Sequence, residues 1–114
     1  MDGEAPARRN SVVFPFSDRI YSGNIDSQMP ILEQFFSAEL PRVIYLDCSR
    51  VQVCDSYALR ALITLRRKAD ERNKQVVIYR PAPTFRKILE ATKLTQLFVI
   101  AESIDDAALP GAAA

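Results

Sequence analysis

The segment spanning residues 43–65, VIYLDCSRVQVCDSYALRALITL, places the strongest constraint on the fold, because a strand pattern gives way to a helix pattern within it. Residues 43–46 form a continuous run of β-branched, aromatic and aliphatic side chains, which is typical of a strand buried on both faces. Further along, apolar residues recur at the 3.6-residue spacing of a helix that packs on a sheet, at Ala58, Leu62, Leu65 and Ala69. The segment therefore predicts a buried strand followed by an amphipathic helix.

Two polar residues, Asp55 and Ser56, stand immediately before this helix. The carboxylate of Asp55 suits the N-cap, and Ser56 would then occupy the first helical position. A helix N-terminus carries a partial positive charge, and open α/β folds present their sites beyond the carboxyl ends of buried strands. The sequence thus predicts one modifiable serine at a place where a site is expected.

The start of the chain predicts a hairpin. Strands are expected at residues 11–16 and 19–22, with a turn between them at residues 17–18. Pro15 indicates that the first strand lies at a sheet edge or contains a bulge, because proline cannot donate a ladder hydrogen bond.

Two further helices are predicted from apolar spacing and flanking residues. The first has Asp26 or Ser27 as its cap and Pro30 in its first turn, where the missing N–H costs little. The central helix is expected to end near Asn73, and Thr84 is the expected cap of the last helix.

Strands are also predicted at residues 75–79 and 99–100. The alternation of strands and helices indicates an α/β domain with a mixed, partly parallel sheet of four to five strands and helices packed mainly on one face. With 114 residues, the chain has room for one domain. We place it at residues 11–102, between a disordered N-terminal tail (1–10) and a flexible C-terminal tail (103–114).

The composition argues against catalysis and metal binding. The chain has no histidine and three glycines, so a Ser-His-Asp triad and a glycine-rich phosphate loop are both excluded. Cys48 and Cys54 are separated by five residues, a spacing that does not match the thioredoxin-type C-x-x-C motif. Two cysteines without any histidine also supply too few ligands for a zinc site. They are best explained as reduced, buried thiols.

Charge is distributed unevenly along the chain. Residues 60–93 contain ten bases and three acids, whereas the rest contains five bases and eleven acids. Such a basic half could bind nucleic acid, a nucleotide or an acidic protein surface, or could simply be a solvated helix face. No aromatic residue interrupts the run RRKADERNK, so this segment offers no base stacking.

The motifs around the central helix resemble those of the STAS domain family, over about residues 11–102. In that family a strand ending in D-x-S leads to D-[ST]-[ST]-G at a helix start, and a later helix carries a proline and two spaced leucines. The matching residues here are Asp47, Ser49, Asp55, Ser56, Pro83, Leu89 and Leu94. Tyr57 and Ala58 stand where a second Ser or Thr and a Gly are usual, and an aromatic at position 57 resembles the stressosome scaffold branch.

The resemblance implies a non-enzymatic binding module that works by partner switching, as in anti-sigma factor antagonists. The unmodified domain would bind an anti-sigma factor or a histidine-kinase-like serine kinase, phosphorylation of Ser56 by that partner would end the complex, and a phosphatase would reverse the change. The expected partner-binding residues are Asp55, Ser56, Tyr57, Arg60, Ser22 and Asn24. No cofactor and no metal are expected, and the lack of any long apolar run indicates a cytoplasmic protein without membrane insertion.

Two alternative functions are compatible with the same residues. The domain could be a STAS subunit or a cytoplasmic domain that regulates a membrane transporter, or it could bind a nucleotide or nucleic acid through its basic half. The individual site residues also have purely structural roles to weigh: Asp55 as an N-cap alone, Tyr57 as a cover for the core rim, and Arg60 as a solvated side chain.

Overall fold

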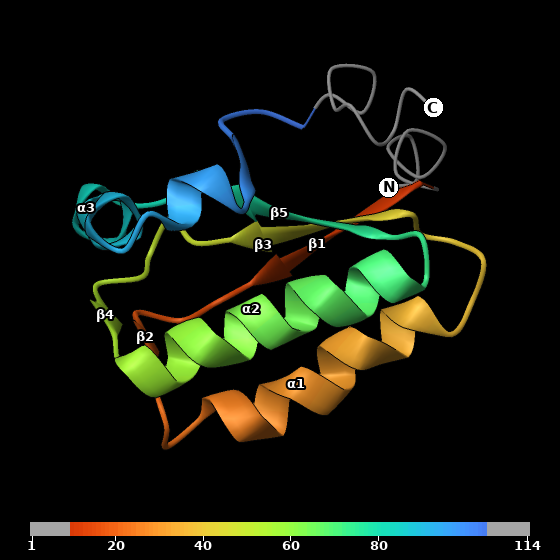
Figure 1. The fold of residues 1–114 in the computed structure, drawn as a ribbon, viewed down its shortest axis with the longest axis horizontal. Coiled ribbons are helices and arrows are strands. Elements are labelled where there is room, and N and C mark those ends of the chain that lie inside the picture. The colour runs from red at the N-terminus through yellow and green to blue at the C-terminus, as the bar shows by residue number, and fades with distance from the viewer. Residues whose placement is uncertain (1–9, 105–114) are drawn as a thin grey trace.

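A parallel four-stranded sheet with the strand order β1-β3-β5-β6 organises the molecule (Figure 1). The computed structural model describes residues 10–104. Its sheet strands are β1 (Ser11–Pro15), β3 (Val43–Asp47), β5 (Gln75–Tyr79) and β6 (Val99–Ala101). All three strand pairs run parallel, so the carboxyl ends of the strands meet at one edge. The strands predicted at residues 75–79 and 99–100 and the edge position of β1 are confirmed.

The predicted opening hairpin is wrong, and the sheet is parallel instead of mixed. β1 pairs with β3 in parallel, and β2 (Arg19–Ile20) pairs in parallel with β4 (Val53–Cys54) to form a separate two-stranded sheet. The chain continues forward after β1 because the Asp18 carbonyl accepts from the Gln52 and Val53 N–H groups. Ile20 becomes completely buried in this arrangement. The pairing of β2 with the distant strand β4 and the burial of Ile20 therefore override the local turn signal at residues 17–18.

Three α-helices accompany the sheet: α1 (Ile25–Glu33), α2 (Ser56–Glu71) and α3 (Pro83–Ala91). Short 3-10 turns follow two of them, η3 (Gln34–Phe36) after α1 and η4 (Leu94–Gln96) after α3. α1 and α2 lie side by side along one face of the sheet (Figure 1). The predicted start of α2 is confirmed, and the helix ends two residues before Asn73, which adopts a left-handed φ of 60°.

The other two predicted caps are wrong. α1 begins directly after Asn24, so Asp26 lies inside its first turn and Pro30 lies in the helix interior, where the Asp26 carbonyl loses its usual N–H donor. The Asn24 side chain instead closes the turn before the helix, accepting from the Tyr21 N–H at 2.9 Å and donating to the Arg19 carbonyl at 2.9 Å. α3 begins at Pro83, whose fixed φ suits the first helical position, so Thr84 follows the cap.

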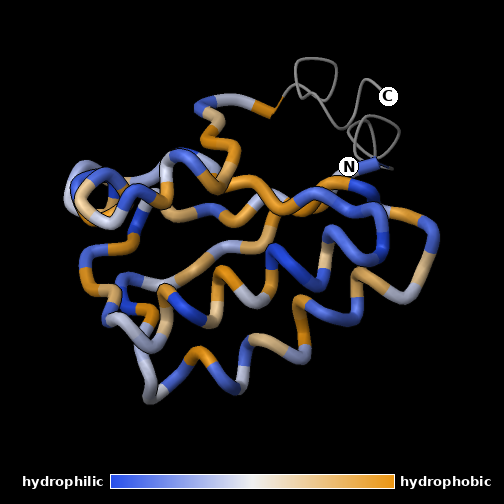
Figure 2. Tube along the Cα trace, viewed as in Figure 1, coloured by the Kyte–Doolittle hydropathy of each residue, from blue (hydrophilic) through white to orange (hydrophobic). Residues whose placement is uncertain are grey.

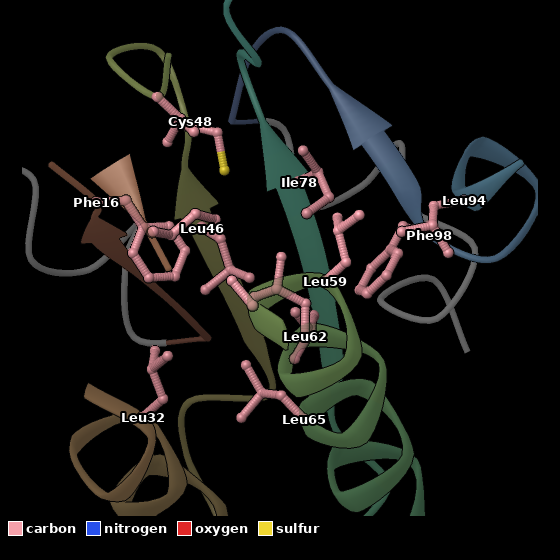
Figure 3. Close-up of a cluster of buried hydrophobic side chains, with 14 of the residues drawn as sticks. Phe16, Leu32, Leu46, Cys48, Leu59, Leu62, Leu65, Ile78, Leu94 and Phe98 are labelled. Carbon is pink, nitrogen blue, oxygen red and sulfur yellow. The ribbon is translucent and has the colours of Figure 1, made fainter. Parts of the chain in front are cut away.

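The main core lies between the sheet and the helices. Leu59, Leu62 and Leu65 of α2 point toward Leu46 of β3 and Ile78 of β5 (Figure 3). Phe85 and Leu89 of α3 join the same cluster. Figure 2 shows the hydrophobic stretches along the central strands and the alternating pattern along α1 and α2. All three helices contribute buried apolar residues to this cluster, which agrees with the prediction that the helices pack mainly on one face of the sheet.

A smaller cluster occupies the opposite face of the sheet. It is built on Val43, Tyr45 and Val77, and the rings of Tyr45 and Tyr79 meet edge to face at 5.6 Å between centroids. β3 therefore has apolar side chains buried on both faces, which confirms the prediction for residues 43–46. Ile104 packs against this cluster. The predicted tails lie outside the described residues except at residues 10, 103 and 104.

Candidate functional site

Asp55 is the N-cap of α2, as predicted, and it also fastens a second segment. One carboxylate oxygen accepts from the Ala58 N–H at 2.8 Å, and the other accepts from the Ser22 N–H at 3.0 Å. These bonds, chiefly the one from Ala58, hold the pKa of Asp55 below its ordinary value because they stabilise the carboxylate. Asp55 therefore ties the turn between β2 and α1 to the start of α2.

Ser56 is the first residue of α2 and is exposed to solvent. Within residues 10–104 its hydroxyl makes no hydrogen bond. The N–H groups of the first helical turn and the helix dipole favour negative charge at this end of α2. The hydroxyl is thus accessible, and a phosphate placed on it would be compatible with the folded helix.

Tyr57 follows on the surface and contacts α1. Its side chain is 43% exposed, and its hydroxyl donates to both carboxylate oxygens of Asp26, each at 2.8 Å. This bond, more than any other influence, raises the pKa of Tyr57. Tyr57 belongs to neither buried cluster, so its principal contact is with α1 and not with the core rim.

Arg60 is exposed one turn after Ser56 and lines a groove of about 390 Å³ between α1 and α2. The groove continues from Tyr57 and Asp26 along both helices. Within the described part of the chain, the Arg60 guanidinium forms no ion pair.

Ser22 and Asn24 lie in the turn that Asp55 anchors. Ser22 is exposed beside Asp55, and its N–H is held by that carboxylate. The Asn24 side chain is engaged inside its own turn through the bonds to the Tyr21 N–H and the Arg19 carbonyl. The structure thus brings Ser22 to the start of α2, whereas the contacts of Asn24 are those of a turn-forming residue.

Sequence reasoning missed two contributors to this surface. Val53 is 45% exposed in β4, two residues before Asp55, and places an apolar side chain near Ser56 in the chain. Asp26 is expected from the sequence only as a helix cap, yet it receives the Tyr57 hydroxyl. No local pattern indicates either one. Strand alternation would place Val51 and Val53 on the same side, yet only Val51 is buried. Tyr57 and Asp26 lie far apart in the sequence.

Both cysteines are free thiols. Cys48 is fully buried, and burial raises its pKa strongly. Burial also raises the pKa of the half-buried Cys54 to about 12, with a smaller effect from Asp55. Across residues 10–104, no three residues of the usual metal-binding types gather as a ligand set.

The basic segment is partly neutralised by the fold. Arg66 pairs with Asp70 at 3.3 Å, and Lys68 pairs with Glu33 at 3.0 Å. Lys74 is buried and donates to three backbone carbonyls, those of Ala38, Glu39 and Pro41. Desolvation lowers the pKa of Lys74. The excess of bases in the sequence therefore does not translate into an equal number of free surface cations.

In the part of the chain that the structure describes, no helix is both long enough and apolar enough to cross a bilayer. No match was found among curated protein sequences. Similar folds occur among solved structures, of which three illustrate the range.

One is a Thermotoga maritima protein described as a candidate anti-sigma factor antagonist, with a TM-score of 0.72, 17% identity, and coverage of 86% of this chain and 84% of that one. A sulfate transporter family protein from Wolinella succinogenes gives a TM-score of 0.73 at 19% identity, covering 91% of this chain and 85% of that one. The phosphorylated form of the Bacillus cell fate determinant SpoIIAA gives a TM-score of 0.64 at 16% identity, covering 84% of this chain and 86% of that one. The likeness at these identities concerns the fold. The STAS domain profile matches residues 4–107, nearly the whole chain, which therefore belongs to the STAS domain family.

Proposed function

We propose that this STAS domain binds a regulatory protein through the surface around Ser56, and that phosphorylation of Ser56 releases that protein. The observation that carries the proposal is the Ser56 hydroxyl, which is exposed and, within residues 10–104, makes no hydrogen bond at the start of α2. Exposed apolar side chains of Val53 and Tyr57 flank it in the sequence. An accessible hydroxyl between apolar anchors suits a contact surface that a charge can disrupt.

The physical basis of the switch is a change of charge within an otherwise unchanged fold. A phosphate brings about −1.5 to −2 charge and added bulk to a surface that had been in contact with the partner. The carboxylate of Asp55 stands beside it, so negative charge accumulates at the interface. The start of α2 tolerates the phosphate, and the domain stays folded while the complex dissociates.

The proposed partner is an anti-sigma factor or a histidine-kinase-like serine kinase, with a phosphatase to reverse the modification. The domain itself acts as a binding module in the cytoplasm and performs no catalysis. Support comes from the likeness to SpoIIAA, whose fold has been solved in both phosphorylated and unphosphorylated forms. Ala58 replaces the usual Gly, and its methyl group is buried in the core. We expect the partner to contact Ser56 together with the exposed residues Val53 and Tyr57.

A second candidate function is regulation of a membrane transporter as an associated subunit or domain. It is favoured by the likeness to the sulfate transporter family protein, which covers 91% of this chain. The two candidates differ in the class of protein that binds the surface around Ser56.

Affinity capture from the native cell tests the proposal. Tagged wild type, Ser56→Ala and Ser56→Asp are used as baits, with Thr95→Asp as the control because Thr95 is exposed on η4, outside the site. We expect wild type, Ser56→Ala and Thr95→Asp to retain one regulatory kinase or anti-sigma factor and Ser56→Asp to lose it, with phosphate found on Ser56 by mass spectrometry. Capture of a transporter subunit would favour the second function, and equal capture by Ser56→Asp would refute the switch.

A further inference from the structure

The groove between α1 and α2 has walls of opposite charge. α1 contributes the carboxylates of Asp26 and Glu33, and α2 contributes the cations of Arg60 and Lys68. The groove begins beside Tyr57, the residue that follows Ser56, so it is continuous with the surface to which we assign the partner.

Most of these charges already have partners within the domain. Asp26 accepts the Tyr57 hydroxyl, and Glu33 pairs with Lys68 at 3.0 Å. Arg60 is the lining cation that has no ion pair within residues 10–104. Arg60 is therefore the cation of the groove that remains available to pair with a carboxylate of a partner, while the Asp26 carboxylate is held by the neutral Tyr57 hydroxyl.

The groove also offers an apolar surface. Met29 of α1 and Ala61 of α2 line it, and both pack from outside against the main core. Thr64, half-buried, follows Ala61 along the same wall. A volume of about 390 Å³ is ample for one aliphatic side chain.

We propose that this groove receives an aliphatic side chain of the regulatory partner next to a carboxylate that pairs with Arg60, and that a phosphate on Ser56 competes for Arg60. The inference rests on the proposed function and names the feature of the partner that the surface selects. Ser56 and Arg60 are four residues apart on α2, the spacing at which helical side chains meet. A dianionic phosphate one turn away attracts the guanidinium strongly, because the planar fork of arginine matches phosphate oxygens.

The competition gives the modification two effects. It adds negative charge that repels the carboxylate of the partner, and it withdraws the cation with which that carboxylate pairs. Release of the partner then depends on Arg60 as well as on Ser56.

The intramolecular half of the proposal is tested without a partner. Protein carrying phosphoserine at position 56 is titrated by ³¹P NMR in three forms: the otherwise wild-type chain, Arg60→Gln and Lys87→Gln. Lys87 is exposed on α3, outside the groove, and its replacement removes the same charge. We expect the second phosphate ionisation, normally near pH 6, to move upward in Arg60→Gln only. An identical titration in all three forms would overturn the capture of Arg60 by the phosphate.

The intermolecular half is tested with the partner identified by affinity capture. We expect Arg60→Glu to weaken binding at least tenfold and Lys87→Glu less than twofold, with unchanged circular dichroism. Thr64→Phe, which fills the groove, is expected to weaken binding in the same way. Wild-type affinity in Arg60→Glu would overturn the inference even if Ser56→Asp still abolishes binding, whereas wild-type binding by Ser56→Asp would overturn the proposed function itself.

Discussion

The Tyr57 hydroxyl donates to both carboxylate oxygens of Asp26 at 2.8 Å, and this bond joins the first turns of α1 and α2. The two residues are 31 positions apart in the chain. Because Ser56 directly precedes Tyr57, the bond fixes the orientation of α1 relative to the proposed phosphorylation site. It also defines the mouth of the groove that Arg60 lines.

The Tyr57–Asp26 bond predicts a late-ionising tyrosine. In the unfolded chain Tyr57 ionises near pH 10, and the bond to Asp26 raises its pKa in the folded state. Its contribution to stability is therefore complete below about pH 10 and is lost as pH rises through the higher folded value. Ultraviolet titration of tyrosinate in wild type minus Tyr57→Phe should show this late transition, and Asp26→Asn should move it back toward pH 10. A difference curve centred at or below pH 10 would contradict the bond.

Asp55 predicts a loss of stability in acid. Its pKa is lowered in the folded state by the Ala58 and Ser22 N–H groups, so its contribution is present above its ordinary value near 3.8 and disappears as pH falls through the folded value. Asp55→Ala should lower the urea midpoint at pH 7, and the gap to wild type should narrow toward pH 3. Asp18→Ala serves as control, since Asp18 is exposed and only its backbone carbonyl makes bonds within residues 10–104. A gap that is constant with pH would argue against the two bonds.

Leu62 packs α2 against the sheet, and its substitution measures how much this packing stabilises the fold. It is completely buried between α2 and the strands, so Leu62→Ala should reduce the free energy of unfolding by about 2–5 kcal/mol. Arg67 is exposed on the same helix, and Arg67→Ala should change it by about 0.5 kcal/mol or less. Chemical denaturation measures both changes. A similar effect of the two substitutions would contradict the assigned inner face of α2.

The two thiols of the folded protein are expected to react slowly with maleimide. Burial raises the pKa of Cys54 to about 12 and raises that of Cys48 as well, so the thiolate population of Cys54 at pH 8 is on the order of 10³-fold below that of a free cysteine. Intact-mass measurement after maleimide treatment should show unmodified native protein and doubly modified protein in concentrated urea. Rapid double modification of the native protein would show that the thiols are exposed.

Sequence patterns correctly predicted the structural features that depend on contacts between residues close together in the chain. The strand at residues 43–46 and the helix that begins at Ser56 follow from side-chain periodicity, and the Asp55 cap follows from its place directly before the helix. Each depends on contacts within a few residues, which the sequence displays directly.

Features set by distant partners were not predictable in this way. The Ser17–Asp18 turn signal suggested a hairpin, but the Asp18 carbonyl bonds to Gln52 and Val53, and Ile20 is buried against the core. The Tyr57–Asp26 bond and the groove arise because α1 and α2 lie side by side, and nothing in either helix pattern indicates its neighbour. Tertiary packing favours the β2–β4 pairing and the α1–α2 contact over the hairpin that the local turn signal suggests.

Charge on Ser56 is expected to end the complex with the partner without unfolding the domain. The direct test is the dissociation constant of the identified partner for stoichiometrically phosphorylated and unmodified protein, measured by calorimetry, with circular dichroism and thermal unfolding recorded on both forms. We predict at least a tenfold weaker complex, about 1.4 kcal/mol or more, with unchanged spectra. Equal affinity of the two forms, or loss of binding that accompanies loss of structure, would rule out release of the partner by phosphorylation of Ser56.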